Sequence, residues 1–128
     1  MIIVYIIAGI ITLFILLQLI VQLRAKFRTG KKIDNLPGHI GDIVRQGAKV
    51  LLYFYSPNCG SCKTQTPVID EMARDTKNIY KVDVSRDLKT AMILGVMGTP
   101  STVIIESGIV KKYFIGYKNK QTLLKFFS

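Results

Sequence analysis

Two cysteines separated by two residues, Cys59 and Cys62, are the only thiols in this chain of 128 residues. A pair at this spacing can close a disulfide within one helical turn, or supply half of a zinc site. The pair follows an apolar run, 50–55, and a break at 56–58, and it opens a stretch with helical character. Cys59 is therefore expected at a helix N-terminus, where unpaired backbone N–H groups and the helix dipole stabilise a thiolate.

This placement makes Cys59 the candidate nucleophile of a thiol–disulfide exchange. Cys62, one turn further into the helix, is expected to be shielded and close enough to resolve a mixed disulfide on Cys59. Two other interpretations are weaker. An inert structural disulfide would close too small a loop to constrain the chain much. A zinc site would need more ligands, but there is no second C-x-x-C and His39 is the only histidine. No metal ion is expected.

The charge of the chain is strongly basic, with 18 Lys and Arg against 8 Asp and Glu. Five basic residues follow a long apolar run: Arg24, Lys26, Arg28, Lys31 and Lys32. The rest of the chain, from Asn35 onward, has 13 basic and 7 acidic side chains. This mild excess favours an acidic partner or an anionic membrane surface. Nucleic acid is not expected as a partner, because no recognition motif is present.

The apolar run itself, Ile2 to Leu23, contains no charged side chain. At about 1.5 Å per residue it is long enough to cross a hydrocarbon core of roughly 30 Å. It is longer than the apolar part of a signal peptide, no basic residue precedes it, and no small-x-small cleavage site ends it. These features predict a retained single-pass membrane anchor. The basic cluster after it predicts that the rest of the chain faces the cytoplasm.

The remainder is too short for two separate cores, so one domain is expected. We assign 1–24 to the anchor, 25–36 to a basic linker and 37–128 to the domain. Hydrophobic periodicity predicts helices at 38–46, 59–75, 87–94 and 119–127, and strands at 48–55, 79–84, 101–106 and 109–117. The two strand–helix alternations predict parallel pairing, and Ser107-Gly108 predicts an antiparallel hairpin. The fold class is α/β, with a four-stranded mixed sheet flanked by helices.

The order of these elements and two motifs resemble the thioredoxin family. The motifs are Cys59-Gly60-Ser61-Cys62-Lys63, with Pro67 five residues after the second cysteine, and Gly95-Val96-Met97-Gly98-Thr99-Pro100. Gly108 and Gly116 follow, and the resemblance covers about residues 38 to 128. It implies a thioredoxin-like fold and a protein-disulfide reductase that needs no cofactor.

The resemblance also implies a role for each site residue. Cys59 matches the attacking cysteine and Cys62 the resolving one, with Gly60 and Ser61 between them. Pro100 matches the family's cis-proline, and with Thr99 it would present backbone groups to a substrate strand. The implied partners are protein disulfides, including those of membrane-bound proteins, and a thiol electron donor such as a reductase. A cytoplasmic domain would be kept reduced and would act as a reductant.

Three residues depart from the family's pattern. Asn58 replaces the Trp before the first cysteine, Ser61 replaces the Pro between the cysteines, and Tyr53 stands where a buried acid moves the proton of the resolving cysteine. Lys81 matches a lysine near that acid and is expected to take part of its electrostatic role. Two alternatives stay open: a non-catalytic adaptor that uses the fold as a binding surface, and an outward-facing oxidoreductase acting on exported proteins.

Overall fold

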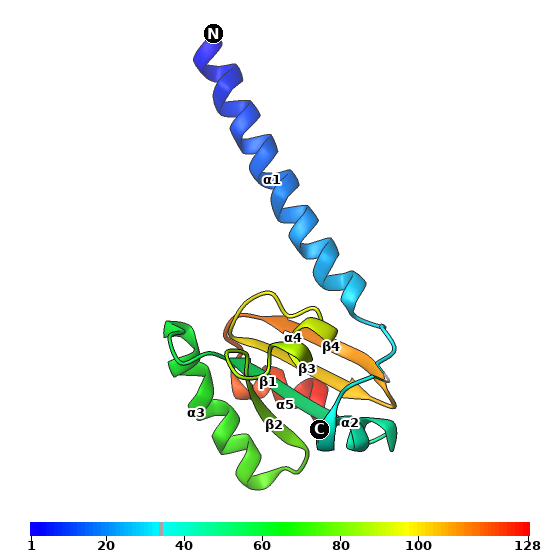
Figure 1. Cartoon of the computed structure of the whole chain (residues 1–128). Coiled ribbons are helices and arrows are strands. Elements are labelled where there is room, and N and C mark those ends of the chain that lie inside the picture. The colour runs from blue at the N-terminus through cyan, green and yellow to red at the C-terminus, as the bar shows by residue number, and fades with distance from the viewer. Residues whose placement is uncertain (34) are drawn as a thin grey trace.

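The computed structural model describes residues 1–33 and 35–128, which form one long helix and one α/β domain (Figure 1). The long helix, α1 (Ile2–Arg28), projects away from the domain. Its segment Ile2–Arg24 is long and apolar enough to cross a membrane by length and composition, and none of its most apolar window is buried against the domain. A signal sequence would have the same properties.

The domain is built on a four-stranded mixed sheet, as the sequence predicted. Its strands are β1 (Val50–Tyr55), β2 (Ile79–Asp83), β3 (Ser101–Glu106) and β4 (Ile109–Ile115), in the order β2-β1-β3-β4. β1 and β2 are parallel, and β3 and β4 form the expected antiparallel hairpin. Ser107 and Gly108 both have a positive φ in its two-residue turn, as a type I′ turn requires.

One pairing differs from the prediction. The second strand–helix alternation was expected to give another parallel pair, but β3 is antiparallel to β1. The helix between β2 and β3, α4 (Leu88–Ile93), has only six residues, and the turn after it starts β3 at the end of the sheet where β2 finishes. The chain therefore never crosses back along the sheet, and the next strand runs the other way.

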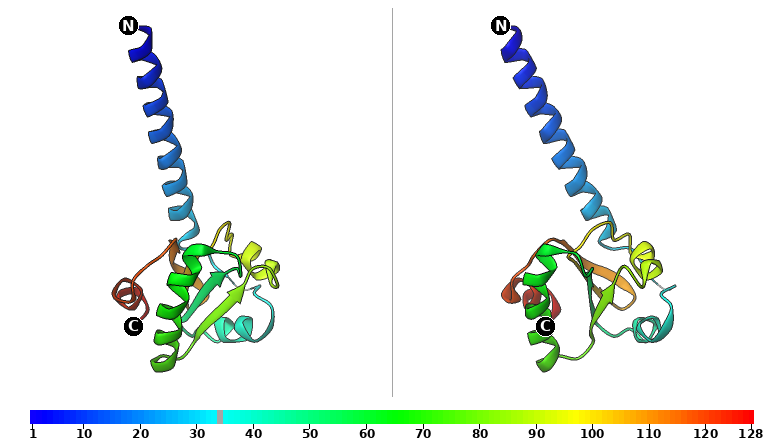
Figure 2. Two further views of the ribbon diagram at one scale, coloured as in Figure 1. Left: turned by 90° about the vertical axis from the view of Figure 1, so that its left-hand side faces the viewer. Right: turned by 60° about the vertical axis from the view of Figure 1, so that its left-hand side comes forward.

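Helices cover both faces of the sheet (Figure 2). α3 (Gly60–Asp75) and α5 (Lys120–Phe127) pack on the face to which Leu51 and Tyr53 of β1 point. α2 (Gly38–Arg45) and α4 pack on the other face, against Leu52 and Phe54. Residues 50–54 are completely buried, because β1 is a central strand covered on both sides.

The segment that was predicted to be a linker is bonded to the sheet. The N–H of Gly30 donates to the carbonyl of Val110 at 2.7 Å, and the N–H of Val110 donates to the carbonyl of Lys31 at 2.9 Å. Ile33 and Leu36 are each 2% exposed and belong to the core beside α2. Because Gly30 follows the end of α1 by two residues, these bonds hold the helix close to the edge of β4.

Candidate active site

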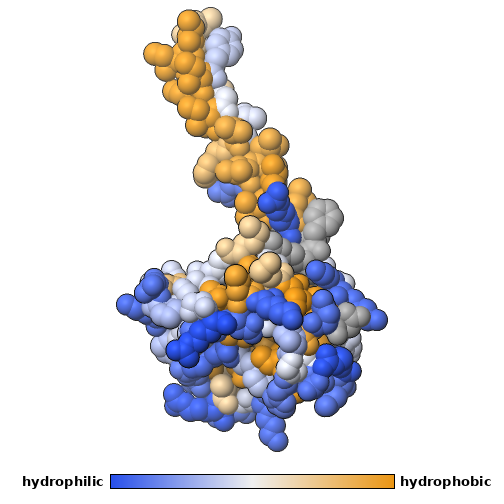
Figure 3. Space-filling view, in the orientation of Figure 1, coloured by the Kyte–Doolittle hydropathy of each residue, from blue (hydrophilic) through white to orange (hydrophobic). Residues whose placement is uncertain are grey.

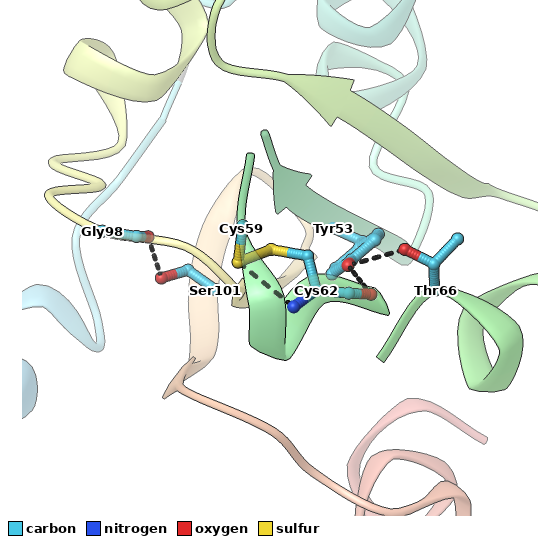
Figure 4. The surroundings of a disulfide bond; sticks show 6 residues. All are labelled: Tyr53, Cys59, Cys62, Thr66, Gly98 and Ser101. Carbon is cyan, nitrogen blue, oxygen red and sulfur yellow. Dashed lines mark hydrogen bonds between the residues drawn. A yellow bond between two sulfur atoms is a disulfide. The ribbon is translucent and has the colours of Figure 1, made fainter. Parts of the chain in front are cut away.

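The cysteine pair lies where β1 ends and α3 begins. Cys59 is the N-cap of α3 and Cys62 lies in its first turn, with their Cα atoms 5.2 Å apart and their sulfurs joined in a disulfide (Figure 4). The N–H of Cys62 donates to Sγ of Cys59 at 3.1 Å. Cys59 is partly exposed, whereas Cys62 is only 3% exposed. The predicted positions of both cysteines are confirmed: one at the helix tip, the other shielded behind it.

A turn from Gly98 to Ser101 lies on the side of the disulfide opposite Tyr53 (Figure 4). The peptide bond between Thr99 and Pro100 in this turn is cis, as the resemblance implied. The hydroxyl of Ser101 donates to the carbonyl of Gly98 at 2.7 Å. The N–H of Gly116 donates to the carbonyl of Pro100 at 2.9 Å. The turn is thus held at its own ends and by the end of β4.

Tyr53 is hydrogen-bonded to the backbone of the resolving cysteine, Cys62. Its hydroxyl donates to the carbonyl of Cys62 at 3.2 Å and lies 2.9 Å from Oγ1 of Thr66. Because a phenol has one proton, Thr66 is the donor in the second bond when the first is made. Burial raises the pKa of Tyr53 above its ordinary value, although the bond to Thr66 lowers it. The group bonded to the backbone of Cys62 is therefore a neutral phenol at physiological pH, not a carboxylate.

Lys81 is the sheet neighbour of Tyr53, since the two residues pair in the parallel ladder of β1 and β2. Its ammonium donates to Oδ1 of Asp70 on α3 at 2.7 Å, and this bond raises the pKa of Lys81. Both charged side chains are 43% exposed. Lys81 therefore stays positive at physiological pH, and its charge acts on Tyr53 by lowering the phenol's pKa.

Gln65 fixes a third segment against α3. Its side chain is completely buried, its Nε2 donates to the carbonyl of Lys118 at 3.1 Å, and the N–H of Lys118 donates to its Oε1 at 2.7 Å. The loop after β4 is thereby attached to the helix that carries the cysteines. Since Gly116 in this loop bonds to Pro100, the three segments around the disulfide are connected.

Comparison with known proteins agrees with this geometry. The family model described as Thioredoxin matches residues 39–128. The chain belongs to the thioredoxin family. It is 36% identical over 77 residues to thioredoxin from Bacillus subtilis, covering 58% of this chain and 74% of that protein. It is 30% identical over 88 residues to thioredoxin from Pseudomonas aeruginosa, covering 66% and 82%.

The thioredoxin fold is also found by structure. A mutant thioredoxin from Halobacterium salinarum matches with a TM-score of 0.63 and 25% identity, covering 77% of this chain and 93% of that one. The protein is thus a thioredoxin-family protein-disulfide reductase, and Cys59 and Cys62 form its C-x-x-C redox pair.

The thioredoxin site opens to solvent through a pocket of about 330 Å³. It is lined by Tyr55, Ser56, Pro57, Cys59, Cys62, Lys63, Thr66 and Pro67. Gly60 and Ser61 are exposed between the cysteines. A partner's disulfide can therefore reach Cys59, which is partly exposed, whereas Cys62 lines the same pocket but is only 3% exposed.

Two polar residues near the pair, Thr66 and Gln65, were not predicted from the sequence. Thr66 stands four residues after Cys62, the spacing at which helix residues share a face, so this signal was available. Gln65 stands four residues before Ile69, on the buried face of the helix. A polar residue on an apolar helix face is the signal that could have found it.

Proposed function

We propose that the chain is a membrane-anchored thioredoxin that reduces partner disulfides, with Cys59 as the attacking thiolate and Cys62 as the resolving thiol. The observation that carries this proposal is the asymmetry of the pair at the helix tip. Cys59 is accessible and receives the N–H of Cys62, an arrangement that favours a negatively charged sulfur. Cys62 is buried and accessible only to a disulfide already formed on Cys59.

The exchange then proceeds in two displacements. The thiolate of Cys59 attacks one sulfur of the partner's disulfide, forming a mixed disulfide and releasing the partner's other sulfur as a thiolate. Cys62 loses its proton and attacks the sulfur of Cys59, which releases the partner's second thiolate and leaves Cys59 and Cys62 oxidised. Two electrons pass to the partner, and a thiol donor such as a reductase restores the dithiol.

The turn at Thr99 and Pro100 receives the substrate strand in this proposal. It lies beside the disulfide, and Gly116 and Ser101 hold it in place. Gly60 and Ser61 support the exchange by keeping the loop between the sulfurs short and open, with the Ser61 hydroxyl available to a thiolate. Lys81 supports it electrostatically by fixing a positive charge next to Tyr53.

The membrane part of the proposal rests on the apolar segment Ile2–Arg24 and the basic residues from Arg24 to Lys32. Residues 1–24 would anchor the chain, 25–36 would link it while bonding to β4, and 37–128 would form the catalytic domain on the cytoplasmic side. There the pair would be kept reduced and would act as a reductant. Tethering raises its effective concentration near membrane-bound partners.

The test is reduction of insulin disulfides by the full chain in detergent with a thiol donor. Wild type should reduce insulin, Cys59→Ser should be inactive, and Cys62→Ser should accumulate a mixed disulfide with the substrate through Cys59. Thr64→Ser is a matched control, because Thr64 is exposed on the same helix and does not line the pocket. Activity in Cys59→Ser equal to wild type would contradict the proposal.

A non-catalytic adaptor is the second candidate, favoured by the residues that replace the family's Trp, Pro and buried acid: Asn58, Ser61 and Tyr53. Full cellular function of a chain with Cys59→Ser and Cys62→Ser would support it.

The orientation of the domain relative to the membrane has its own test. An impermeant maleimide should label Cys59 only after cells are opened, and labelling in intact cells would place the domain outside, where it would act on exported proteins.

A further inference from the structure

The domain exposes three large apolar side chains on one short segment. Outside α1, the most exposed large apolar side chains among residues 35–128 are Met97 at 80%, Met92 at 68% and Leu88 at 60%. Leu88 and Met92 are one turn apart on α4, and Met97 lies in the loop between α4 and Pro100. We call these three residues the α4 surface. Clustered exposed apolar side chains mark a surface that contacts a partner or a membrane.

The α4 surface belongs to the end of the domain from which α1 projects. In Figures 1 and 2, α4 and the yellow loop after it lie at this end in every view, and the loop reaches furthest toward α1. The first turn of α3, which carries the cysteines, lies at the same end, and the C-terminus lies further from α1. Figure 3 shows apolar atoms at the surface of the domain directly below α1.

The bonds of the linker, made at the hairpin end of β4, restrict how far the domain can move from α1. Arg24 closes the apolar span, and Gly30 is already bonded to Val110 of β4. The six residue-to-residue steps from Arg24 to Gly30 cover about 9 Å at the helical rise of about 1.5 Å per residue. If α1 spans a bilayer, the α4 surface is held near the headgroups of that same bilayer.

The charges around the α4 surface suit a lipid surface. Arg86 and Lys89 are exposed beside Leu88, and Lys31 and Lys32 are exposed in the bonded linker. Of the two acidic residues next to these cations, Asp87 accepts the N–H of Thr90 as the cap of α4, and Asp83 lies 3.9 Å from the Nε of Arg86. Apolar side chains next to lysine and arginine on α4, with two further lysines in the linker, are typical of segments that lie in the interface of an anionic membrane.

We propose that Leu88, Met92 and Met97 insert into the interface of the bilayer that α1 spans. This inference rests on the membrane anchor of the proposed function. The domain is then docked on the lipid, and the turn at Pro100 and the cysteine pair face the layer just above the headgroups. The partners of this site are disulfides that membrane proteins present close to the lipid–water boundary, and disulfides far from the bilayer are reached slowly.

The chain contains no tryptophan, so one introduced indole reports on its own surroundings. We would compare Met97→Trp, Phe126→Trp and Phe14→Trp in the full chain, in vesicles of mixed zwitterionic and anionic lipids with brominated acyl chains. Phe14 lies within α1, and Phe126 lies on the last turn of α5, near the C-terminus. Bromine should reduce the emission of Met97→Trp at least about twofold, with a blue-shifted maximum, and should leave Phe126→Trp unchanged.

The three variants separate the possible failures. If the emission of Phe14→Trp is not reduced, α1 does not lie in the bilayer, and both the anchor and the docked surface are wrong. If Phe14→Trp is quenched but Met97→Trp behaves like Phe126→Trp, the anchor stands and the docking is overturned. A blue shift of Met97→Trp without quenching would mean that protein covers the α4 surface, which also overturns it. Insulin reduction by the same variants tests the redox activity separately.

Discussion

The two faces of the sheet are filled with different kinds of side chain. On the face covered by α2 and α4, the completely buried side chains are hydrophobic, Leu52, Phe54 and Val103 among them, and the buried polar residues Ser101 and Thr90 are 1% and 3% exposed. On the face covered by α3 and α5, an apolar cluster is accompanied by three completely buried side chains with polar atoms: Tyr53, Gln65 and Thr102. The cysteine pair lies on this second face, at the start of α3.

The two faces therefore differ in role: one mainly stabilises the fold, and the other positions the residues of the site. Burying a polar group costs free energy unless it is hydrogen-bonded, so the more apolar face is the more stabilising one. Tyr53 and Gln65 instead bond to segments of the site, the carbonyl of Cys62 and both backbone groups of Lys118. We infer that the apolar face supplies most of the stability, and that the polar groups of the other face fix the geometry around the redox pair.

The largest expected effect is therefore on the apolar face. Phe54→Ala should lower the free energy of unfolding by about 3–5 kcal/mol, because it removes a fully buried ring and leaves a cavity. Urea denaturation of the full chain in detergent measures this loss. Phe126→Ala is a matched control at a position that is 36% exposed, and it should cost much less. Equal losses for the two variants would contradict the assignment of stability to this face.

Gln65→Ala should have the next largest effect. It leaves the backbone groups of Lys118 without their partner, which we expect to cost about 1–3 kcal/mol of the free energy of unfolding. Hydrogen exchange at the Lys118 N–H should also become faster. Gln121→Ala on the exposed side of α5 is the matched control, and it should stay within about 0.5 kcal/mol of wild type. An unchanged exchange rate in Gln65→Ala would mean that Gln65 does not hold the loop.

Sequence patterns predicted the apolar face better than the polar one. Leu52 and Phe54 belong to a short apolar run whose character is visible locally, and the C-x-x-C marks the start of α3 by itself. The bond from Tyr53 to Cys62 depends on how α3 packs across β1, which no local pattern encodes. Tyr53 was noted only as a departure from the family.

The linker shows the same limit. Ile33 and Leu36 are two apolar residues in a stretch that is otherwise rich in charge and turn residues, so the stretch was assigned to a linker. Their burial depends on pairing with the edge of β4, more than seventy residues away in the sequence. Such long-range pairing determines which residues of an ambiguous stretch enter the core, and local composition cannot predict it.

Tyr53→Phe tests the polar face with a smaller expected loss of stability, since only the hydroxyl is lost. We expect a loss of about 1 kcal/mol at neutral pH, because the bonds to Cys62 and Thr66 disappear. The folded pKa of Tyr53 is raised above the ordinary value of 10.0, chiefly by burial. The phenol's contribution is therefore fully present below pH 10 and is lost as the pH rises through the folded pKa.

The advantage of wild type over Tyr53→Phe should consequently shrink in strong alkali. Urea denaturation at a series of pH values from about 8 to 11 measures this change. Tyr80→Phe, on the opposite face beside His39, is the matched control for loss of a hydroxyl. If the stability difference between wild type and Tyr53→Phe stays constant with pH, folding does not raise the pKa of Tyr53.

Thr102→Val should give the smallest change, and it should have the opposite sign. Thr102 lies opposite Tyr53 in the antiparallel ladder, and its Oγ1 has no hydrogen-bond partner among the residues that the structure describes. Valine has nearly the same shape without the hydroxyl, so we expect a gain of about 0.5–1 kcal/mol in the free energy of unfolding. Ser101→Ala is the contrasting variant on the same strand, because its hydroxyl is bonded to Gly98 and its removal should destabilise. If Thr102→Val destabilises as Ser101→Ala does, the hydroxyl of Thr102 is bonded in solution, and the polar groups of this face form a larger network around Tyr53 than the three bonded segments alone.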